Sequence, residues 1–297
     1  MRSPKGSGSR IVSLLVVSAA VVVAVWPAAA FAATQPRLGT IANPGYTVVA
    51  GSTITNTGSS VVTGNLALSP GTAVTGMTFS TSPGPGVVTG SHDVANGPAL
   101  QAQSDLTIAY TDAANAISTA DLSGQDLGNK NLGPGVYSFS SSAQLTGPLT
   151  LSGNGVFIFK IGSTLTTASA SSVLLANGAQ ACAVFWQVGS SATLGGGTSF
   201  QGNLMAQASI TLVTAANILT GRALARTGAL TLDTNRITPP TGPCTVAATT
   251  TTPPGTTVGL PNTGGPPPQP ALPWWPLAIA GTIGAILIGV RRRAHHS

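Results

Sequence analysis

The residues that could carry out a reaction are few and scattered. The chain has six acidic residues, all of them Asp, whereas glycoside hydrolysis usually needs two paired carboxylates. Asp121 and Asp126 fall in one loop, where an Asp side chain commonly stabilises its own turn. His92 is the only histidine before the last three residues, and it has no partner for a zinc site or a catalytic triad. The sequence therefore predicts no enzyme, no cofactor and no metal site.

Threonine is the side chain whose spacing suggests a binding surface. Each of several threonines lies beside a Leu in a strand-like phrase. These are Thr164, Thr166, Thr193, Thr211 and Thr231. If they align, they form a flat array of hydroxyls and methyls. The alternative is that Thr is simply a good strand residue on any solvent-facing surface.

Recurring phrases between residues 145 and 237 indicate how the threonines would be aligned. Phe159-Lys160-Ile161-Gly162-Ser163 returns 27 residues later as the phrase 186–190, and the phrase 202–206 returns 19 residues later as 221–225. A Thr-Gly-x-Leu-x-Leu phrase occurs at 63–68, 146–151 and 227–232. Short strands repeating at such intervals indicate stacked coils with a shared apolar core, in which Trp186 would be buried. The sequence predicts an irregular β-solenoid.

One segment differs from this pattern. Residues 99–118 contain no Gly or Pro, and Leu106, Ala109, Ala113 and Ile117 recur at helical spacing. Pro98 suits the first turn of a helix. The sequence predicts one amphipathic helix packed along the solenoid.

The N-terminal segment has the three parts of a secretory signal. Arg2, Lys5 and Arg10 precede an apolar run over 11–25, and small residues follow up to Ala32. We expect a signal peptide over 1–32, with an uncleaved anchor helix as the alternative. Residues 247–257 are rich in Thr and Pro, a composition that stays extended.

The C-terminal segment resembles a sortase sorting signal. Leu260, Pro261, Asn262, Thr263 and Gly264 form the cleavage motif; a short apolar segment over 274–290 and Arg291-Arg292-Arg293 follow. The resemblance implies that sortase transpeptidase joins Thr263 to peptidoglycan, which predicts a secreted, surface-exposed protein anchored to the cell wall. A plain membrane anchor is the alternative.

Four segments result from these signals. They are the signal peptide (1–32), the β-solenoid domain (33–246), a stalk (247–259) and the sorting signal (260–297). The formal charge is +6, but residues 33–263 contain equal numbers of basic and acidic side chains. The basic ones are Arg37, Lys130, Lys160, Arg222, Arg226 and Arg236. The sequence therefore predicts no nucleic-acid partner, and a membrane role only for the two terminal segments.

The only two cysteines, Cys182 and Cys244, both lie in the domain that we expect to be exported. Two cysteines in an exported chain suggest a disulfide bond between them. In the chain-entropy model, such a bond stabilises the fold by roughly 4 kcal/mol.

The order of motifs over 38–237 resembles the ice-binding-protein-like domain found in many bacteria and some fungi. The motifs that carry the resemblance are 38–40, 49–58, 68–72, 102–106 with 109–110, 132–137, 182–189 and 221–225. The resemblance implies an all-β, discontinuous and irregular right-handed β-solenoid of triangular section with one long α-helix along it. It also implies that N-terminal strands pack beside C-terminal coils, which would account for the resemblance between 63–68 and 227–232.

The resemblance implies adsorption to an ice crystal through a flat β-face. Some members carry a Thr-(Ala/Gly)-x-(Thr/Asn) pattern there, which Thr214-Ala215-Ala216-Asn217 fits, so Thr214 and Asn217 join the five threonines as candidates. Stacked strands repeat at about 4.8 Å, close to spacings in ice. The alternative is a surface adhesin or structural wall protein on the same scaffold that does not bind ice.

Overall fold

The structure, a computed structural model, describes residues 33–42, 45–78 and 84–246. The chain divides into two units, Met1–Thr250 and Thr251–Ser297, and every described residue belongs to the first. The signal peptide, the stalk and the sorting signal expected from the sequence lie outside the described residues. Within the described residues, no helix is long and apolar enough to cross a membrane.

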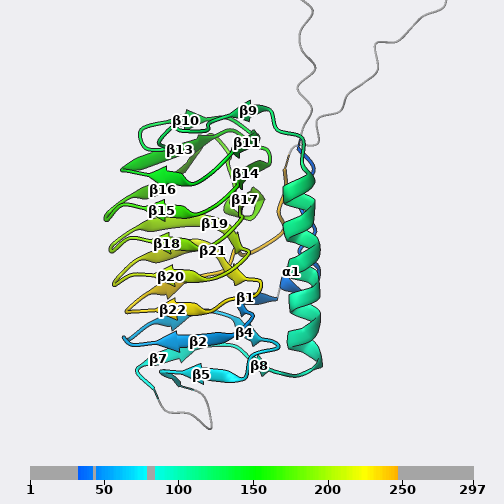
Figure 1. The fold of residues 1–297 in the computed structure, drawn as a ribbon, viewed down its shortest axis with the longest axis vertical. Helices are drawn as coiled ribbons and strands as arrows, with labels where there is room; N and C mark the ends of the chain where they lie inside the picture. Colours follow the sequence, from blue (N-terminus) through cyan, green and yellow to red (C-terminus); the bar gives the residue numbers. More distant parts are fainter. Residues whose placement is uncertain (1–32, 43–44, 79–83, 247–297) are drawn as a thin grey trace, which may run out of the picture. The chain divides into compact units, whose positions relative to one another are not determined.

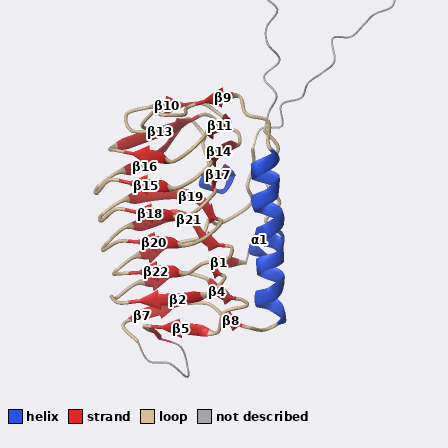
Figure 2. Ribbon diagram, viewed as in Figure 1, coloured by secondary structure: helices blue, strands red, loops and turns tan. Residues whose placement is uncertain are grey.

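Short parallel strands are the main regular element of the described chain (Figures 1 and 2). One sheet has seven strands, stacked in the order β12-β15-β18-β20-β22-β2-β5. Their bounds are β12 (Ala143–Leu145), β15 (Leu165–Thr167), β18 (Ala192–Leu194), β20 (Ile210–Leu212), β22 (Leu230–Leu232), β2 (Thr53–Asn56) and β5 (Ala73–Thr75). All six strand pairs in this sheet are parallel.

The second sheet has sixteen strands in two arms. The helix-side arm contains β9 (Ala120–Asp121), β11 (Gly135–Phe139), β14 (Phe157–Ile161), β17 (Val184–Val188), β1 (Tyr46–Ala50), β4 (Asn65–Leu68) and β8 (His92–Val94). The far arm contains β10 (Asn131–Leu132), β13 (Pro148–Ser152), β16 (Ser172–Ala176), β23 (Arg236–Ile237), β3 (Val61–Val62), β7 (Gly86–Val88) and β6 (Met77–Thr78). Two long strands, β19 (Ser199–Ala206) and β21 (Asn217–Ala225), pair with strands of both arms.

The repeated phrases of the sequence correspond to paired strands. Phe159 pairs with Trp186, and residues 202–206 pair in register with 221–225. Gly202 and Gly221 lie where the long strands pass between the arms, with φ of 104° and 158°. A Cβ on Gly221 would come within 2.0 Å of the Gly202 carbonyl oxygen. This close approach explains why the phrase begins with Gly each time.

The Thr-Gly-x-Leu-x-Leu phrase is not a structural repeat. Its copy at 63–68 leads into β4 beside β1 in the sixteen-stranded sheet, whereas its copy at 227–232 leads into β22 in the seven-stranded sheet. N-terminal strands do pack beside C-terminal ones, because β1 pairs with β21, β2 with β22 and β3 with β23. The pairing is therefore as expected, but it does not account for the resemblance between 63–68 and 227–232, because these two phrases lie in different sheets.

A continuous apolar core fills the space between the sheets. An aromatic stack runs through it: the Tyr137 and Phe159 rings lie 5.4 Å apart, those of Phe159 and Trp186 4.0 Å, and those of Trp186 and Phe200 4.9 Å. Trp186 is fully buried, as the sequence predicts. Offset contacts between aromatic rings add to the stabilisation from burial, so the stack supports strands on both sides of the core.

The predicted helix is α1 (Gly97–Asn115), which runs along the stack beside the helix-side arm (Figure 1). The Asn96 side chain caps it by accepting a 3.0 Å hydrogen bond from the Ala99 amide. Small side chains allow it to approach the sheet closely, and the fully buried ones are Ala99, Ala102, Ala109 and Ala113. Ile117 was expected on the buried face but lies beyond the helix and is 87% exposed, because the helix ends at Asn115.

Two short 3₁₀ helices flank this arm, η1 (Gly39–Ile41) and η2 (Ala181–Ala183). Cys182 in η2 is bonded to Cys244, with their Cα atoms 5.8 Å apart. The predicted disulfide is therefore present.

Candidate functional site

The threonine row is the most regular feature of the described surface. It consists of outward-facing threonines in matching register on six adjacent strands of the seven-stranded sheet, namely Thr166, Thr193, Thr211, Thr231, Thr55 and Thr75. Each is the direct cross-strand partner of the next. Adjacent strands lie about 4.8 Å apart, so the hydroxyls and methyls repeat at that interval.

A flanking row of small side chains lies two residues earlier in the chain, at the start of a strand or just before it. It consists of Ser142, Thr164, Ser191, Ser209, Ala229, Thr53 and Ala73. The Ser142 and Thr164 hydroxyls lie 2.8 Å apart. The Ser209 amide donates to the Ser191 hydroxyl, and the Ala229 amide donates to the Ser209 hydroxyl. These bonds tie neighbouring strands together, so the flanking row is in register like the threonine row.

Buried neighbours fix the threonine row from beneath. Each threonine is preceded in its strand by an apolar residue that points inward, for example Leu165 before Thr166 and Ile210 before Thr211, both fully buried. Thr is β-branched and has few accessible χ1 rotamers. A backbone held by core packing and a stiff side chain together make the row rigid before it meets any ligand.

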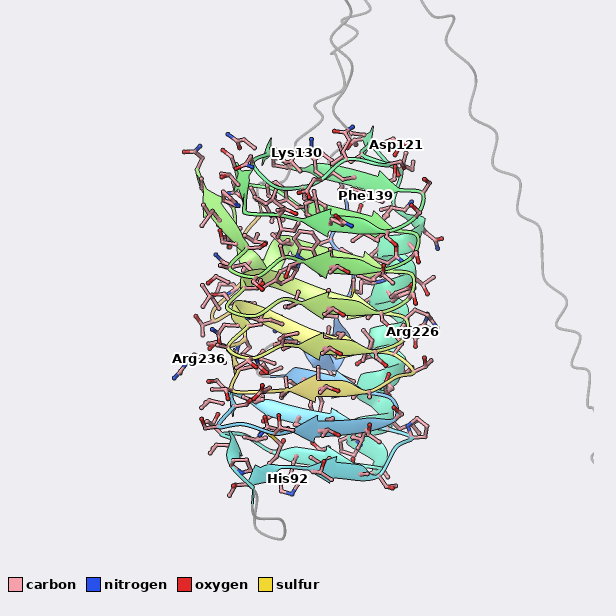
Figure 3. The ribbon with its side chains drawn as sticks, turned by 60° about the vertical axis from the view of Figure 1, so that its left-hand side comes forward. His92, Asp121, Lys130, Phe139, Arg226 and Arg236 are labelled. Atoms are coloured by element: carbon pink, nitrogen blue, oxygen red, sulfur yellow. A yellow bond between two sulfur atoms is a disulfide. The ribbon has the colours of Figure 1, made fainter. Side chains whose placement is uncertain are left out.

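Charged side chains in the described chain lie outside the threonine row. In Figure 3, the labelled Arg226 and Arg236 lie at opposite side edges of the view, and Asp121 and Lys130 lie at its upper end. Asp233 lies at one border of the row, where it accepts a hydrogen bond from the Thr214 hydroxyl. The row thus presents neutral groups only.

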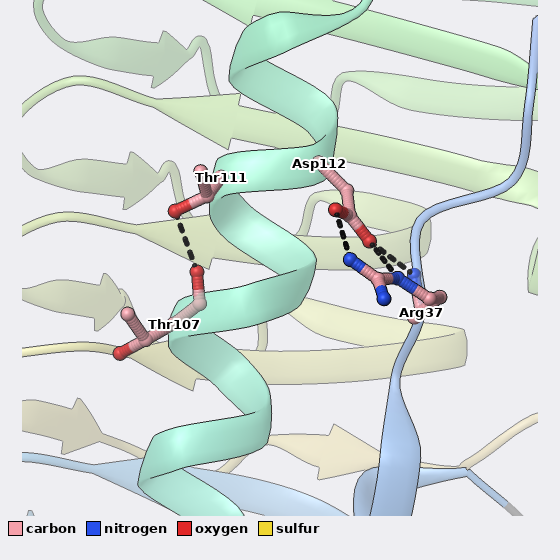
Figure 4. Close-up of polar contacts among 4 residues, drawn as sticks. All are labelled: Arg37, Thr107, Thr111 and Asp112. Atoms are coloured by element: carbon pink, nitrogen blue, oxygen red, sulfur yellow. Dashed lines mark hydrogen bonds and ion pairs between the residues drawn. The ribbon is translucent and has the colours of Figure 1, made fainter.

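The helix side of the molecule concentrates the charges instead. Arg37 donates to the Asp112 carboxylate through its Nε at 2.9 Å and also through its Nη2 and its backbone amide (Figure 4). These hydrogen bonds and the positive charge hold the pKa of Asp112 below its ordinary value. Lys160 donates to the Ala116 carbonyl at the end of the helix. These contacts join the helix to the N-terminal segment and to the sheet.

Two further arginines, Arg222 and Arg226, pack against neighbouring side chains on the helix side of the molecule. Arg222 is 4% exposed and donates to the Asn203 side chain at 2.9 Å. Burial lowers the pKa of Arg222 to about 10, because a buried cation loses hydration. Arg226 lies over the Tyr110 ring, 4.7 Å from its centroid. Both therefore serve packing at this side of the fold.

The candidate threonines differ in their placement. Thr166, Thr193, Thr211 and Thr231 lie side by side in the threonine row, and Thr164 lies in the flanking row. Thr214 and Asn217 lie elsewhere, at the corner where the chain passes from β20 to β21. The Asn217 amide donates to the Ala215 carbonyl, and its oxygen accepts from the Arg236 amide. The structure therefore does not bring Thr214 and Asn217 onto the face formed by the other five.

Two members of the row were missed from the sequence. Thr55 and Thr75 come from β2 and β5, which precede the helix in the chain; β2 joins the row by pairing with β22, and β5 joins it by pairing with β2. The loop carboxylates have turn roles: Asp121 accepts from the Ser123 amide, and Asp126 from the Gly128 amide. The sorting motif over 260–264 lies outside the described residues.

Comparison with known families and curated proteins gives several matches. Residues 48–238 match the family described as ice-binding-like. Over 143 residues the chain is 59% identical to an ice-binding protein of Nostoc sp. (strain HG1), covering 47% of this chain and 53% of that protein. It is 38% identical over 143 residues to an ice-binding protein of Flavobacterium frigoris (strain PS1), covering 47% and 51%. The chain thus spans about half the length of the curated relatives it matches.

Solved structures give matches over more of the chain. An ice binding protein from an Antarctic biological consortium matches with a TM-score of 0.65 and 41% identity, covering 70% of this chain and 92% of that one. The matching domain of Shewanella frigidimarina ice-binding protein 1 has a TM-score of 0.63 and 29% identity, covering 71% and 100%. The mostly β architecture with parallel sheets and one helix is therefore shared with these structures.

Proposed function

Because the chain belongs to the ice-binding-like family, we propose that it binds ice through the threonine row and the flanking row of its seven-stranded sheet. The observation that carries the proposal is the direct pairing of six threonines across six strands. The matched proteins from Nostoc and Flavobacterium are themselves named ice-binding proteins.

Adsorption to ice requires complementarity over an area and makes or breaks no covalent bond. A repeat of about 4.8 Å along the stack is close to spacings in ice. Each Thr hydroxyl can donate and accept hydrogen bonds to surface water, while its methyl excludes other water. The absence of charge from the row favours this role, because a charged group holds its own hydration shell and disturbs an ordered water layer.

We extend the proposal to the scaffold, as a discontinuous right-handed β-solenoid of triangular section. Connections between parallel strands in one sheet are right-handed in about 98% of cases. The seven-stranded sheet and the two arms of the sixteen-stranded sheet would supply the three sides. A three-sided coil would place the threonine row and the helix on different sides of the same core.

Residue substitutions on the face test ice binding most directly. Thr193→Tyr and Thr211→Tyr each place a large ring in the middle of the row and should reduce thermal hysteresis and partition into an ice hemisphere at least tenfold. Ser104→Tyr is the matched control, since Ser104 is exposed on the helix. It should leave both readouts unchanged. Circular dichroism would establish that all three variants are folded.

The result that contradicts the proposal is equally concrete. If the folded wild-type protein is excluded from growing ice, the alternative of a surface adhesin or structural wall protein takes first place. If it enters ice but both tyrosine variants still do so, the binding face is elsewhere.

We also propose that the protein is exported and anchored to the cell wall. Segments 1–32 and 260–297 support this through their order of charged, apolar and cleavage-site residues. In the bacterium, Thr263→Ala should move the protein from the peptidoglycan fraction to the membrane fraction. An unchanged peptidoglycan fraction would mean that sortase does not process this site.

A further inference from the structure

The threonine row does not continue to the last strand of its sheet. The next position beyond Thr166 is Gln144 in β12, its direct cross-strand partner. Beyond β12, Asp126 forms a single parallel bridge with Gln144. The same line of outward positions therefore changes from six threonines to an amide and then to a carboxylate.

Gln144 differs from the threonines in reach and in stiffness. It is exposed, and its unbranched side chain places an amide farther from the backbone than a Thr hydroxyl. It also has more rotatable bonds, so ordering it against a surface costs more conformational entropy. A side chain that projects above the threonines and moves prevents a flat crystal plane from extending past Thr166.

Asp126 adds a charge one position farther on. Its carboxylate accepts from the Gly128 amide at 2.5 Å and the Thr146 amide at 3.0 Å. Partial burial opposes ionisation, but these hydrogen bonds prevail and hold the pKa of Asp126 below its ordinary value. Asp126 is therefore ionised at neutral pH and retains bound water.

We propose that Gln144 sets one end of the ice-binding array and so limits its length. The inference rests on the proposed function of the threonine row. It predicts a gain of activity on substitution. Gln144→Thr adds a seventh threonine in register, and contact area grows in proportion to the number of strands engaged.

Thermal hysteresis of the full chain measures the effect. Gln144→Thr should raise it by about 1.2-fold or more, in proportion to the added contact area. Gln125→Thr is the matched control: Gln125 is exposed at the same end of the stack and hydrogen-bonded to Lys130, but it lies off the row. It should leave thermal hysteresis unchanged.

Thr193→Tyr separates failure of this inference from failure of the proposed function. If Thr193→Tyr abolishes activity and Gln144→Thr has no effect, Gln144 is not the limit, although the face stands. If Thr193→Tyr leaves activity intact, the face itself is wrong, and the inference about Gln144 fails with it.

A second inference concerns β23, the last strand before the C-terminal tail. In the far arm it lies between β21 and β3. It has only two residues, and it is held by the pairing of Ile237 with Ile218 and with Val62, and of Arg236 with Val61. Tension on a tail attached directly to β23 would peel this strand away and separate the two parts of the arm.

The tail is fastened elsewhere before it leaves the described residues. Cys244 is bonded to Cys182 in η2, just before β17. The Gln180 amide donates to the Thr245 carbonyl at 2.6 Å, and the Asn203 amide donates to the Cys182 carbonyl at 3.2 Å. The tail next to Cys244 is thus attached covalently and by hydrogen bonds to the middle of the stack.

We infer that the Cys182–Cys244 disulfide transfers tension applied at the C-terminus to η2 and spares β23. Only the physiological source of that tension, the wall anchor, depends on the proposed function. The bond closes a loop with a sequence separation of 62. While the bond is intact, tension cannot extend the residues between the two cysteines. Fully extended, these residues would span roughly 200 Å, at about 3.5 Å per residue.

Optical tweezers test this without ice or a cell wall. The full chain would be held at its C-terminus and at an azide-bearing residue replacing Asn131, which is exposed near the β10 end. The oxidised protein should unfold with about 200 Å less extension and at a higher first force than the Cys182→Ser/Cys244→Ser variant.

Reductant added to the folded wild-type protein provides a second comparison with no change of sequence, and it should reproduce the behaviour of the variant. Equal first forces and equal extensions in all three samples would overturn the inference. So would free thiols found in the untreated protein by a thiol assay.

Discussion

The seven-stranded sheet and the helix-side arm share one core but differ on their outer surfaces. The outer face of the seven-stranded sheet repeats the same residue type at the same position on six strands. On the helix-side arm, one outward line passes from Phe185 to Asn203 to Arg222. These three side chains are buried beneath other parts of the chain, whereas the threonines are accessible.

The difference shows where regularity is required. A covered surface can use any side chains whose shapes and hydrogen bonds are matched by the covering residues, as the Asn203 amide is matched by the Cys182 carbonyl in η2. In the described part of the chain, no residues cover the threonine row of the seven-stranded sheet. Internal packing therefore does not require the same residue to recur there. Regularity therefore belongs to the surface that we propose to meet a periodic ligand.

The largest expected effect comes from removing support that both surfaces share. Trp186→Ala would leave a cavity between Phe159 and Phe200, which lie 4.0 and 4.9 Å from the Trp186 ring. We expect a loss of about 3–5 kcal/mol in the free energy of unfolding, with loss of ice affinity. Thermal denaturation and ice partition would measure both, and an unchanged melting temperature would contradict a shared core.

The next-largest effect is expected on the stability of the fold alone, with no effect on the proposed ice-binding face. Cys244→Ser should lower the free energy of unfolding by up to roughly 4 kcal/mol, because the unfolded chain regains the freedom of a long loop. Thermal hysteresis near 0 °C should be retained, since neither cysteine lies in the seven-stranded sheet. Equal melting temperatures with and without reductant would show that the bond has no structural role.

A smaller effect is expected where the N-terminal segment meets the helix. The Asp105 carboxylate accepts from the Thr40 amide at 2.7 Å, from the Thr40 hydroxyl at 2.6 Å and from the Gln101 amide at 2.9 Å. Asn offers a single acceptor oxygen and an amide that faces these donors. Asp105→Asn should therefore cost about 1–3 kcal/mol and leave ice affinity at low temperature unchanged.

The same carboxylate makes stability depend on pH. Burial raises the pKa of Asp105, but the hydrogen bonds from Thr40 and Gln101 outweigh it, and the net shift is downward. A depressed pKa means that the contribution is complete above the unfolded value of about 3.9 and is lost as pH falls through the folded value. Melting curves between pH 7 and pH 2 should show this acid loss in the wild type and a smaller loss in Asp105→Asn. Parallel curves would contradict it.

The smallest effect is expected when a single hydroxyl group is removed from the threonine row. Thr211→Val keeps the methyl and the shape of the side chain, so stability should change by no more than about 0.5 kcal/mol. Thermal hysteresis should fall measurably but less than for Thr211→Tyr. Thr111→Val is the matched control, because Thr111 is exposed on the helix, away from the row, and its hydroxyl donates to the Thr107 carbonyl (Figure 4). Equal hysteresis in both variants would mean that the hydroxyl is dispensable.

Regular features of the fold could be predicted from the sequence because stacked strands repeat their inward side chains. The intervals of 27 and 19 residues became strand pairs for this reason. Four of the six threonines in the row were identified in the same way. The helix was predicted from its spacing and from Pro98, although Ile117 was wrongly included, because a pattern of apolar residues does not mark the last turn.

The remaining features depend on contacts that no local pattern carries. Thr55 and Thr75 join the row only because β2 pairs with β22 and with β5. Thr214 and Asn217 fit a motif but lie at a corner, where Ala215 has a φ of 61° and the chain changes direction. A sequence motif does not show which side of a turn its residues face.

The pairing of Thr231 with Thr55 determines when the proposed ice-binding face can be completed. Residues 46–94 emerge early from any N-to-C synthesis or export, yet their partners β21, β22 and β23 come last among the described strands. The four threonines of β15, β18, β20 and β22 therefore meet the two of β2 and β5 at a seam that closes only after nearly the whole domain has been made. Such distant contacts slow folding. A chain interrupted before β22 would hold parts of the array but never the continuous six-strand surface.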